Sequence, residues 1–151
     1  MARVRVGEPA PDFALEGIGG KTHRLADHSG EWLVLAFYPG DFTPVCTRQF
    51  CAYRDGADRL DTLDAAILGI SPQTVSSHER FTEKHELTVP LLADPDRSAI
   101  KAYGVGGPAG HVRRSIFVID PEGVIRHRDV ALLGLRYRDV ESLATTLDGL
   151  R

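Results

Sequence analysis

Residues 38–51, YPGDFTPVCTRQFC, hold both cysteines of this 151-residue chain, Cys46 and Cys51. Thr43 is a residue type that begins helices, because its hydroxyl can accept a backbone N–H of the first turn. Pro44 fits the first helical position, where its missing N–H costs nothing. Cys46 then lies in the first turn, where free N–H groups and the positive end of the helix dipole favour a thiolate. This spacing is typical of a nucleophilic cysteine, although a buried and inert cysteine fits the same turn.

A longer signature covers the same stretch. Pro39, Thr43 and Cys46 match the proline–three residues–threonine–two residues–cysteine pattern of peroxiredoxins, the thiol peroxidases of the thioredoxin superfamily. Cys51, five residues after Cys46, resembles the bacterioferritin comigratory protein branch of the AhpC/TSA family, also called peroxiredoxin Q. The resemblance extends from EPAPDFAL near the N-terminus to the last expected helix.

The resemblance implies a thiol-dependent peroxidase that reduces hydrogen peroxide and small alkyl hydroperoxides. Cys46 would attack one peroxide oxygen as a thiolate and become a cysteine sulfenic acid. Thr43 would contact both the thiolate and the bound peroxide, and Pro39 would shield the cysteine from water. Cys51 would resolve the sulfenic acid as an intramolecular disulfide with Cys46, and thioredoxin would then reduce that disulfide.

An arginine is expected beside Cys46, because a fixed cation favours a thiolate and stabilises an oxyanion. The family places this arginine just before the strand that ends in aspartate, and Arg114, six residues before Asp120, fits that place. Arg113 is adjacent, and alternation along a strand would point the two side chains to opposite faces. We therefore favour Arg114 over Arg113 as the fourth catalytic residue, after Cys46, Thr43 and Pro39.

Two positions depart from the pattern of the branch. Val45 stands where the branch usually has glycine, and Gln49 stands where it commonly has glutamate, a partner for the arginine. A glutamine can accept a hydrogen bond from an arginine but contributes no charge. Neither change removes a reacting group.

The spacing of the two cysteines limits how they can react. On one regular helix, five residues correspond to about 7.5 Å of rise and about 140° of rotation. The two Cα atoms would then lie roughly 8 to 9 Å apart, beyond the usual disulfide range of about 4.4 to 6.8 Å. If Cys51 is the resolving cysteine, the first turns of this helix must therefore unwind. Alternatively, Cys51 packs on the helix and a thiol of a second molecule resolves Cys46.

Strands that alternate with helices surround this motif and predict a single α/β domain over residues 1–151. The expected architecture is a thioredoxin-like fold with a central mixed β-sheet and helices on both faces. A Gly19–Gly20 turn predicts an N-terminal hairpin. A Ser76–Glu79 capping box and an Asp94–Pro95 start predict two of the helices. The expected strands are 33–38, 65–71, 89–93, 115–120 and 124–130, and the expected helices are 44–63, 77–85, 95–103 and 137–147.

Composition and charge exclude several classes of protein. A hydrophobic content of 42% and a charged content of 26% are ordinary for a globular domain. The net charge of −3 gives no reason to expect a nucleic-acid or anionic-membrane surface. No run is long enough to span a membrane, MARVRVGEPAP lacks the apolar core of a signal peptide, and two cysteines do not make a disulfide scaffold. We therefore expect a cytoplasmic protein, and the resemblance to the branch implies either a monomer or a homodimer.

No metal or organic cofactor is expected. The six histidines include no pair at metal-binding spacing with a cysteine or carboxylate, and the glycines of 104–110 do not have the spacing of a dinucleotide fingerprint. Two other functions stay open. A thiol–disulfide oxidoreductase normally has a C-x-x-C motif, whereas position 49 is glutamine here. A non-enzymatic redox sensor on the same fold would use Cys46 as a switch.

Overall fold

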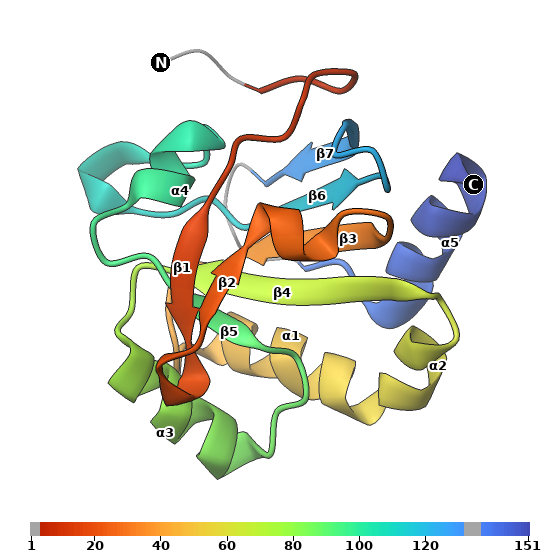
Figure 1. Cartoon of the computed structure of the whole chain (residues 1–151). Coiled ribbons are helices and arrows are strands. Elements are labelled where there is room, and N and C mark those ends of the chain that lie inside the picture. The colour runs from red at the N-terminus through yellow and green to blue at the C-terminus, as the bar shows by residue number, and fades with distance from the viewer. Residues whose placement is uncertain (1–3, 132–136) are drawn as a thin grey trace.

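The computed structural model describes residues 4–131 and 137–151. The first three residues of MARVRVGEPAP, the segment that lacks the apolar core of a signal peptide, lie outside these ranges. The described residues form a seven-stranded mixed sheet in the order β2-β1-β5-β4-β3-β6-β7 (Figure 1). The strands are β1 Ala14–Gly17, β2 Thr22–Arg24, β3 Trp32–Phe37, β4 Ala65–Ser71, β5 Leu91–Ala93, β6 Ser115–Ile119 and β7 Ile125–Val130. The helices are α1 Pro44–Asp55, α2 Ala57–Asp61, α3 Val75–His85, α4 Ser98–Ala102 and α5 Val140–Leu150, with short 3-10 turns at Ile18–Gly20, Leu25–His28 and Pro108–Gly110.

β3 and β4 lie at the centre of the sheet because both strands are almost entirely apolar. In β3, residues 33–37 are buried, as expected for a strand that is covered on both faces. β4 pairs with it in parallel and β6 pairs with it antiparallel. A parallel pair needs a crossover connection, which α1 and α2 supply here. The cysteine motif therefore lies at the carboxyl-terminal end of β3, where the crossover begins.

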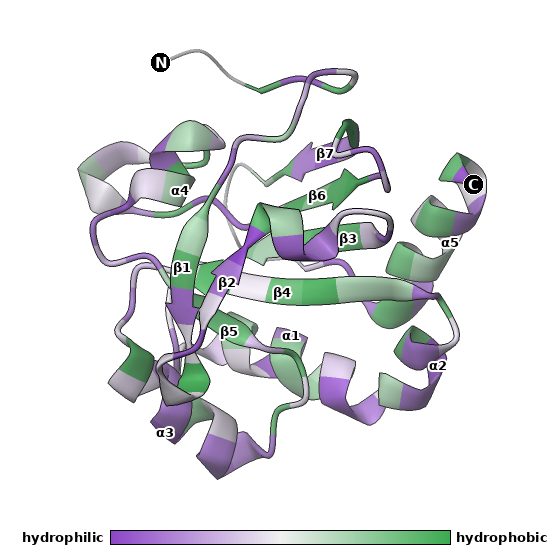
Figure 2. Cartoon of the chain, in the orientation of Figure 1, coloured by the Kyte–Doolittle hydropathy of each residue, from purple (hydrophilic) through white to green (hydrophobic). Residues whose placement is uncertain are grey.

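Side chains that alternate along β3 separate the protein interior into two cores. Val34, Ala36 and Tyr38 pack under α1, α2, α3 and α5, whereas Leu33, Leu35 and Phe37 pack under α4 and the N-terminal segment. Figure 2 shows hydrophobic residues along β4 and β6 and a mixture of hydrophobic and hydrophilic residues on the helices. The sheet with helices on both faces confirms the predicted α/β architecture.

The predicted helix over residues 44–63 is wrong in one respect, because it is two helices. α1 ends at Asp55 and α2 begins at Ala57, with Gly56 between them at φ −97° and ψ 19°. A Cβ atom at Gly56 would lie only 2.6 Å from Cγ2 of Val140 on α5. The close approach of α5 thus requires glycine at the position where the helix breaks.

Two predicted helix starts are also wrong. α3 begins at Val75, and its cap is Thr74, whose Oγ1 accepts a hydrogen bond from the Ser77 amide at 3.2 Å, so Ser76 does not form a capping box. α4 begins only at Ser98, because the Asp94 carboxylate accepts the amide of Ile100 at 2.8 Å and orders the intervening turn.

The C-terminal helix and β5 also differ from their expected bounds. α5 spans Val140–Leu150, three residues later than expected at each end, because Asp139 accepts the Ser142 amide at 2.8 Å and caps the helix there. β5 is limited to Leu91–Ala93, since only these three residues pair with β4.

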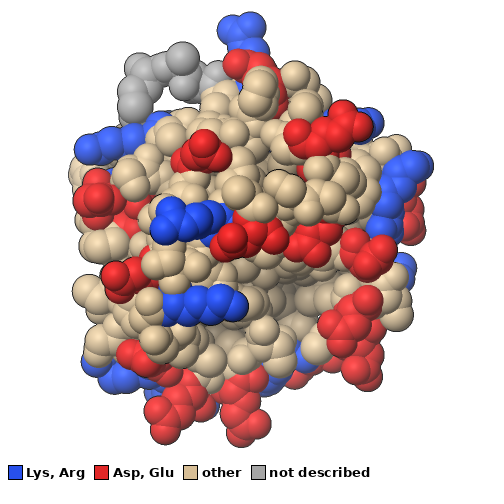
Figure 3. Space-filling view, in the orientation of Figure 1, with Lys and Arg blue, Asp and Glu red and all other residues tan. Residues whose placement is uncertain are grey.

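The hairpin and the last two strands agree with expectation. β1 pairs antiparallel with β2 across the Ile18–Gly20 turn, and β6 pairs antiparallel with β7. None of the described helices is long and apolar enough to cross a membrane. On the face drawn in Figure 3, acidic and basic side chains are interspersed over the described surface.

Candidate active site

Cys46 occupies the first turn of α1, as its spacing from Pro44 predicts. Thr43 is the N-cap residue by position, and Pro44 is the first helical residue. The Cys46 side chain is fully buried and is a free thiol. Since a buried thiolate has little water to solvate it, its stability depends on the helix N-terminus and on any cation nearby.

The hydroxyl of Thr43 does not cap the helix, and this part of the prediction is wrong. Thr43 Oγ1 instead donates a hydrogen bond to the Gly40 carbonyl at 2.8 Å. The preceding residue, Phe42, has a φ of +63°, a left-handed conformation that turns the chain between Asp41 and Thr43. The loop therefore fixes the threonine hydroxyl at the exposed start of α1, three residues before the buried thiol.

Arg114 is brought to Cys46 by the pairing of β3 with β6. The antiparallel register ends with Phe37 opposite Ser115. Tyr38, which follows Phe37, and Arg114, which precedes Ser115, therefore lie at the same end of this strand pair. Arg114 is only 4% exposed, and its Nη2 donates to Cys46 Sγ at 3.1 Å. A buried guanidinium at this distance favours the thiolate and can stabilise an oxyanion.

Arg113 lies elsewhere. A Cβ atom at Gly107 would be 3.6 Å from both Cγ and Nε of Arg113, so this side chain packs against the loop that follows α4. Of the two adjacent arginines, the structure brings only Arg114 into contact with Cys46.

Two uncharged side chains, Gln49 and Tyr53, form a chain of hydrogen bonds that holds Arg114 from the other side. Its Nη1 donates to Gln49 Oε1 at 2.5 Å, and Gln49 Nε2 donates to the Tyr53 hydroxyl at 3.0 Å. Tyr53 in turn donates to the Arg138 carbonyl at 2.7 Å, and burial raises the pKa of Tyr53 so that the phenol keeps its proton. Because the Tyr53 proton is used in this way, its oxygen must accept from Gln49, and the Gln49 oxygen must face Arg114.

Tyr53 belongs to this hydrogen-bonded group although no motif in the sequence marks it as a site residue. The signal was present, since Gln49 and Tyr53 are four residues apart and therefore lie on the same helix face. The glutamine at position 49 still contacts the arginine, but the contact carries no negative charge.

The remaining candidates lie close to Cys46 in the chain. Pro39 is half-buried at the beginning of the loop after β3. Cys51 is half-buried against the core that lies under α1, α2, α3 and α5. It is a free thiol and lies on the same regular helix as Cys46. The geometry thus brings together Cys46, Arg114 and Gln49, and it holds Cys51 on a separate turn.

A cavity of about 340 Å³ lies against Gln49 and Arg114 and extends to Asp129, Tyr137 and Arg138. Cys46 and Thr43 do not line this cavity, whereas Thr43 and Pro44 are exposed at the start of α1. Within residues 4–131 and 137–151, no group of three or more histidine, cysteine, aspartate or glutamate side chains could hold a metal ion.

Comparison with known proteins identifies close relatives. The sequence pattern of the AhpC/TSA family matches residues 6–128. "Peroxiredoxin Bcp" of Bacillus subtilis is 39% identical over 127 residues, which cover 80% of this chain and 81% of that protein. "Peroxiredoxin Q, chloroplastic" of Arabidopsis thaliana is 38% identical over 128 residues, which cover 83% of this chain and 59% of that protein. The crystal structure of peroxidoxin BcpB from Mycobacterium tuberculosis superposes with a TM-score of 0.87 at 28% identity and covers 99% of both chains.

The contact between Arg114 and Cys46 predicts a selective effect of substitution. Arg114→Ala should shift the alkylation of Cys46 by iodoacetamide to higher pH, because the thiolate loses its nearest cation. It should also slow oxidation of Cys46 by hydrogen peroxide by about a hundredfold. Both rates are measured in a Cys51→Ser background, so that Cys46 is the only thiol.

Arg113→Ala is the matched control, because it removes the same charge from the adjacent position. It should leave both rates close to those of the unaltered protein. Equal effects of the two substitutions would contradict the assignment of Arg114.

Proposed function

Because this chain belongs to the AhpC/TSA family of peroxiredoxins, we propose that Cys46 is the thiol with which it reduces peroxides. The observation that carries the proposal is the 3.1 Å hydrogen bond from the buried Arg114 guanidinium to Cys46 Sγ. As a peroxiredoxin, the protein uses a peroxide substrate and a thiol reductant.

In the first step, the Cys46 thiolate attacks one peroxide oxygen. An S–O bond forms and the O–O bond breaks, so that Cys46 becomes a sulfenic acid. The departing hydroxide or alkoxide takes a proton from solvent and leaves as water or alcohol. Arg114 stabilises the negative charge as it moves from sulfur to the departing oxygen, and it does so without reorganisation because Gln49 already holds it.

Thr43 and Pro39 act on the peroxide and on water. The Thr43 hydroxyl, which donates to the Gly40 carbonyl in the free protein, can turn toward a peroxide bound at the exposed start of α1. Pro39 covers one side of the thiol and limits the access of water. These groups do not distinguish hydrogen peroxide from small alkyl hydroperoxides, so we propose both as substrates.

In the second step, Cys51 resolves the sulfenic acid. The Cys51 sulfur attacks the Cys46 sulfur, the S–O bond breaks, and the hydroxide leaves as water with the Cys51 proton. A dithiol protein such as thioredoxin then reduces the disulfide by exchange. We place this cycle in the cytoplasm, where such reductants stay reduced.

The second step requires α1 to unwind locally. Cys46 and Cys51 lie within the continuous helix Pro44–Asp55, where their Cα atoms are roughly 8 to 9 Å apart. Phe50 lies between them and is fully buried, with its ring 4.6 Å from that of Tyr38 and 5.6 Å from that of Tyr53. Closing the disulfide must therefore release Phe50 from these contacts, which makes the oxidised form locally less stable.

Turnover separates a peroxidase from the two alternatives. With hydrogen peroxide, thioredoxin, thioredoxin reductase and NADPH, the unaltered protein should consume many equivalents of peroxide, and Cys46→Ser should consume none above background. A redox sensor would be oxidised once and stop. A thiol–disulfide oxidoreductase would reduce a disulfide substrate faster than a peroxide, and either result would contradict the proposal.

Thr43→Val tests the role assigned to the threonine hydroxyl. Valine keeps nearly the same shape but cannot donate a hydrogen bond, so the transition state loses one donor. Peroxide consumption should fall by about a hundredfold or more. Thr47→Val is the matched control, because the Thr47 hydroxyl bonds only the Thr43 carbonyl on the helix surface. Near-normal turnover by Thr43→Val would mean that the hydroxyl serves only the loop.

The disulfide mechanism is tested in the oxidised protein itself. Peptide mapping after treatment with one equivalent of peroxide should find Cys46 linked to Cys51 within one chain. Amide exchange over residues 44–56 should increase strongly in that form, because the helix can no longer keep its hydrogen bonds. Cross-linked dimers with α1 still protected would show instead that a second molecule resolves Cys46.

A further inference from the structure

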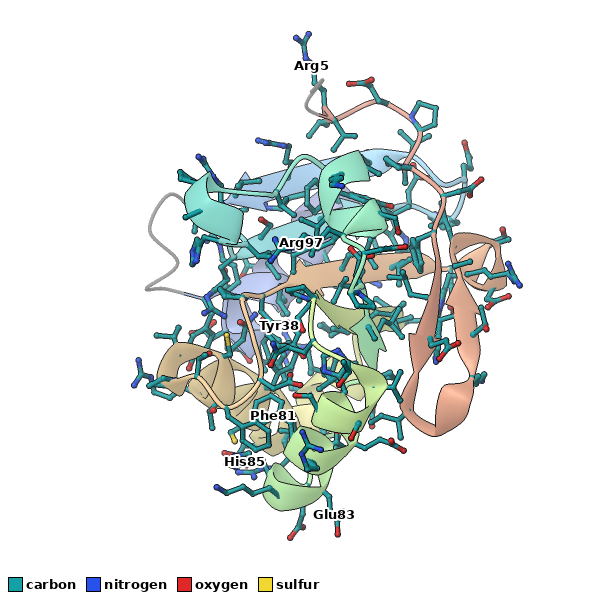
Figure 4. The ribbon with its side chains drawn as sticks, turned by 90° about the vertical axis from the view of Figure 1, so that its left-hand side faces the viewer. Arg5, Tyr38, Phe81, Glu83, His85 and Arg97 are labelled. Atoms are coloured by element: carbon teal, nitrogen blue, oxygen red, sulfur yellow. The ribbon has the colours of Figure 1, made fainter. Side chains whose placement is uncertain are left out.

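A buried polar cluster joins the loop after β3 to α3. The Tyr38 hydroxyl donates to Asp41 Oδ1 at 2.7 Å, and Ser77 Oγ donates to Asp41 Oδ2 at 2.7 Å. Nδ1 of His78 lies 2.7 Å from the same Asp41 oxygen, and both of these side chains are fully buried. We refer to Tyr38, Asp41, Ser77 and His78 as the loop cluster. Figure 4 shows Tyr38 near the end of β3, with Phe81 and His85 on the helix below it.

The geometry of the loop cluster links the charge of its histidine to that of its carboxylate. Nε2 of His78 lies 3.0 Å from the Leu92 carbonyl on β5, which can only accept a hydrogen bond. The other ring nitrogen faces the Asp41 carboxylate, which also only accepts when ionised. An ionised Asp41 therefore requires a proton on both ring nitrogens, which makes Asp41 and His78 an ion pair.

The remaining partners support this assignment. Burial, followed by the charge of Asp41, raises the pKa of Tyr38, so its phenol keeps the proton that it donates to the carboxylate. Asp41 thus accepts three hydrogen bonds from three side chains, and each of its oxygens is satisfied.

A buried ion pair is a costly way to stabilise a protein, because apolar side chains of similar volume often serve at least as well. Its position suggests another role. Asp41 lies two residues before Thr43, and between them Phe42 adopts φ +63°, a conformation that is unfavourable for a bulky side chain. Phe42 remains 43% exposed, and its ring packs against Phe81 at 5.1 Å, with Lys84 Nζ 5.8 Å from the ring centroid. The buried polar attachment of this loop to α3 is the Asp41 carboxylate.

We propose that the Asp41–His78 ion pair is a positioning device that holds Thr43 where the peroxide binds. It ties the loop to α3 and β5, elements that lie outside the part of α1 that must unwind. Asp41 and His78 do not touch the thiol or the peroxide in this account. The proposal rests on the proposed peroxidase function, because positioning matters only if Thr43 takes part in the reaction.

The test compares two rates of the same thiol. In a Cys51→Ser background, Asp41→Asn keeps the shape of the side chain and removes the charge of the pair. Oxidation of Cys46 by hydrogen peroxide should slow by about ten- to a hundredfold, because the loop hydroxyl is misplaced. Alkylation by iodoacetamide, which needs the thiolate but not Thr43, should change by less than about twofold. His78→Gln should give the same split, and the double variant should be no slower than the slower single variant, since the two residues act as a unit.

Asp94→Asn is the matched control. Asp94 is equally buried and accepts hydrogen bonds from Ser98, Ala99 and Ile100, so its loss should lower the melting temperature without changing either rate. If Asp41→Asn and His78→Gln also lowered only the melting temperature, the pair would be structural and the proposal would be overturned. An equal fall in both rates would overturn it as well, because Cys46 itself would then have moved.

A nitrogen-15 spectrum of the histidine rings tests the charged pair independently of activity. At neutral pH both ring nitrogens of His78 should have the chemical shifts of an imidazolium, with the signals assigned by their loss in His78→Gln. A neutral ring would overturn the ion pair. If the unaltered protein did not react with peroxide at all while His78 was an imidazolium, the proposed function and the positioning role would fail but the ion pair would stand.

Discussion

The buried contact between Arg114 and Cys46 is the constraint on which the rest of the site depends. A thiolate with no access to water is unstable unless a cation and oriented donors replace the missing solvent. The cation comes from the start of β6 and the donors come from the start of α1, segments that are 68 residues apart in the chain. The antiparallel pairing of β3 with β6 brings them together, so the central sheet is also the scaffold of the proposed active site.

Two hydrogen-bond networks of different character hold the two sides of this site. On the side of Arg114, the side chains of Gln49 and Tyr53 are uncharged and add no negative charge of their own. On the side of Thr43, the loop is tied to α3 through the buried side chains of Asp41 and His78. A charged partner at Gln49 would compete with the thiolate for Arg114, whereas an ion pair removed from the thiol can fix a strained loop without that competition.

The features that could be predicted from the sequence are those set by local spacing. The position of Cys46 in the first turn follows from Thr43 and Pro44, and the central strands follow from continuous apolar runs. Features that arise from contacts between distant elements could not be predicted in the same way. The break at Gly56 depends on Val140, and the direction of the Thr43 hydroxyl depends on the folded loop. His78 has the spacing of an ordinary helix residue, and only the fold places Asp41 and the Leu92 carbonyl at its two nitrogens.

The central claim is that the surroundings of Cys46 make this thiol far more reactive toward peroxide than Cys51, the other thiol of the chain. The most direct measurement is the second-order rate constant for oxidation by hydrogen peroxide of two single-cysteine proteins, Cys51→Ser and Cys46→Ser, followed by stopped flow at neutral pH. The account predicts that Cys46 reacts at least about a thousandfold faster than Cys51, since only Cys46 has the cation and the donors of the site. Similar rate constants for the two cysteines would contradict it.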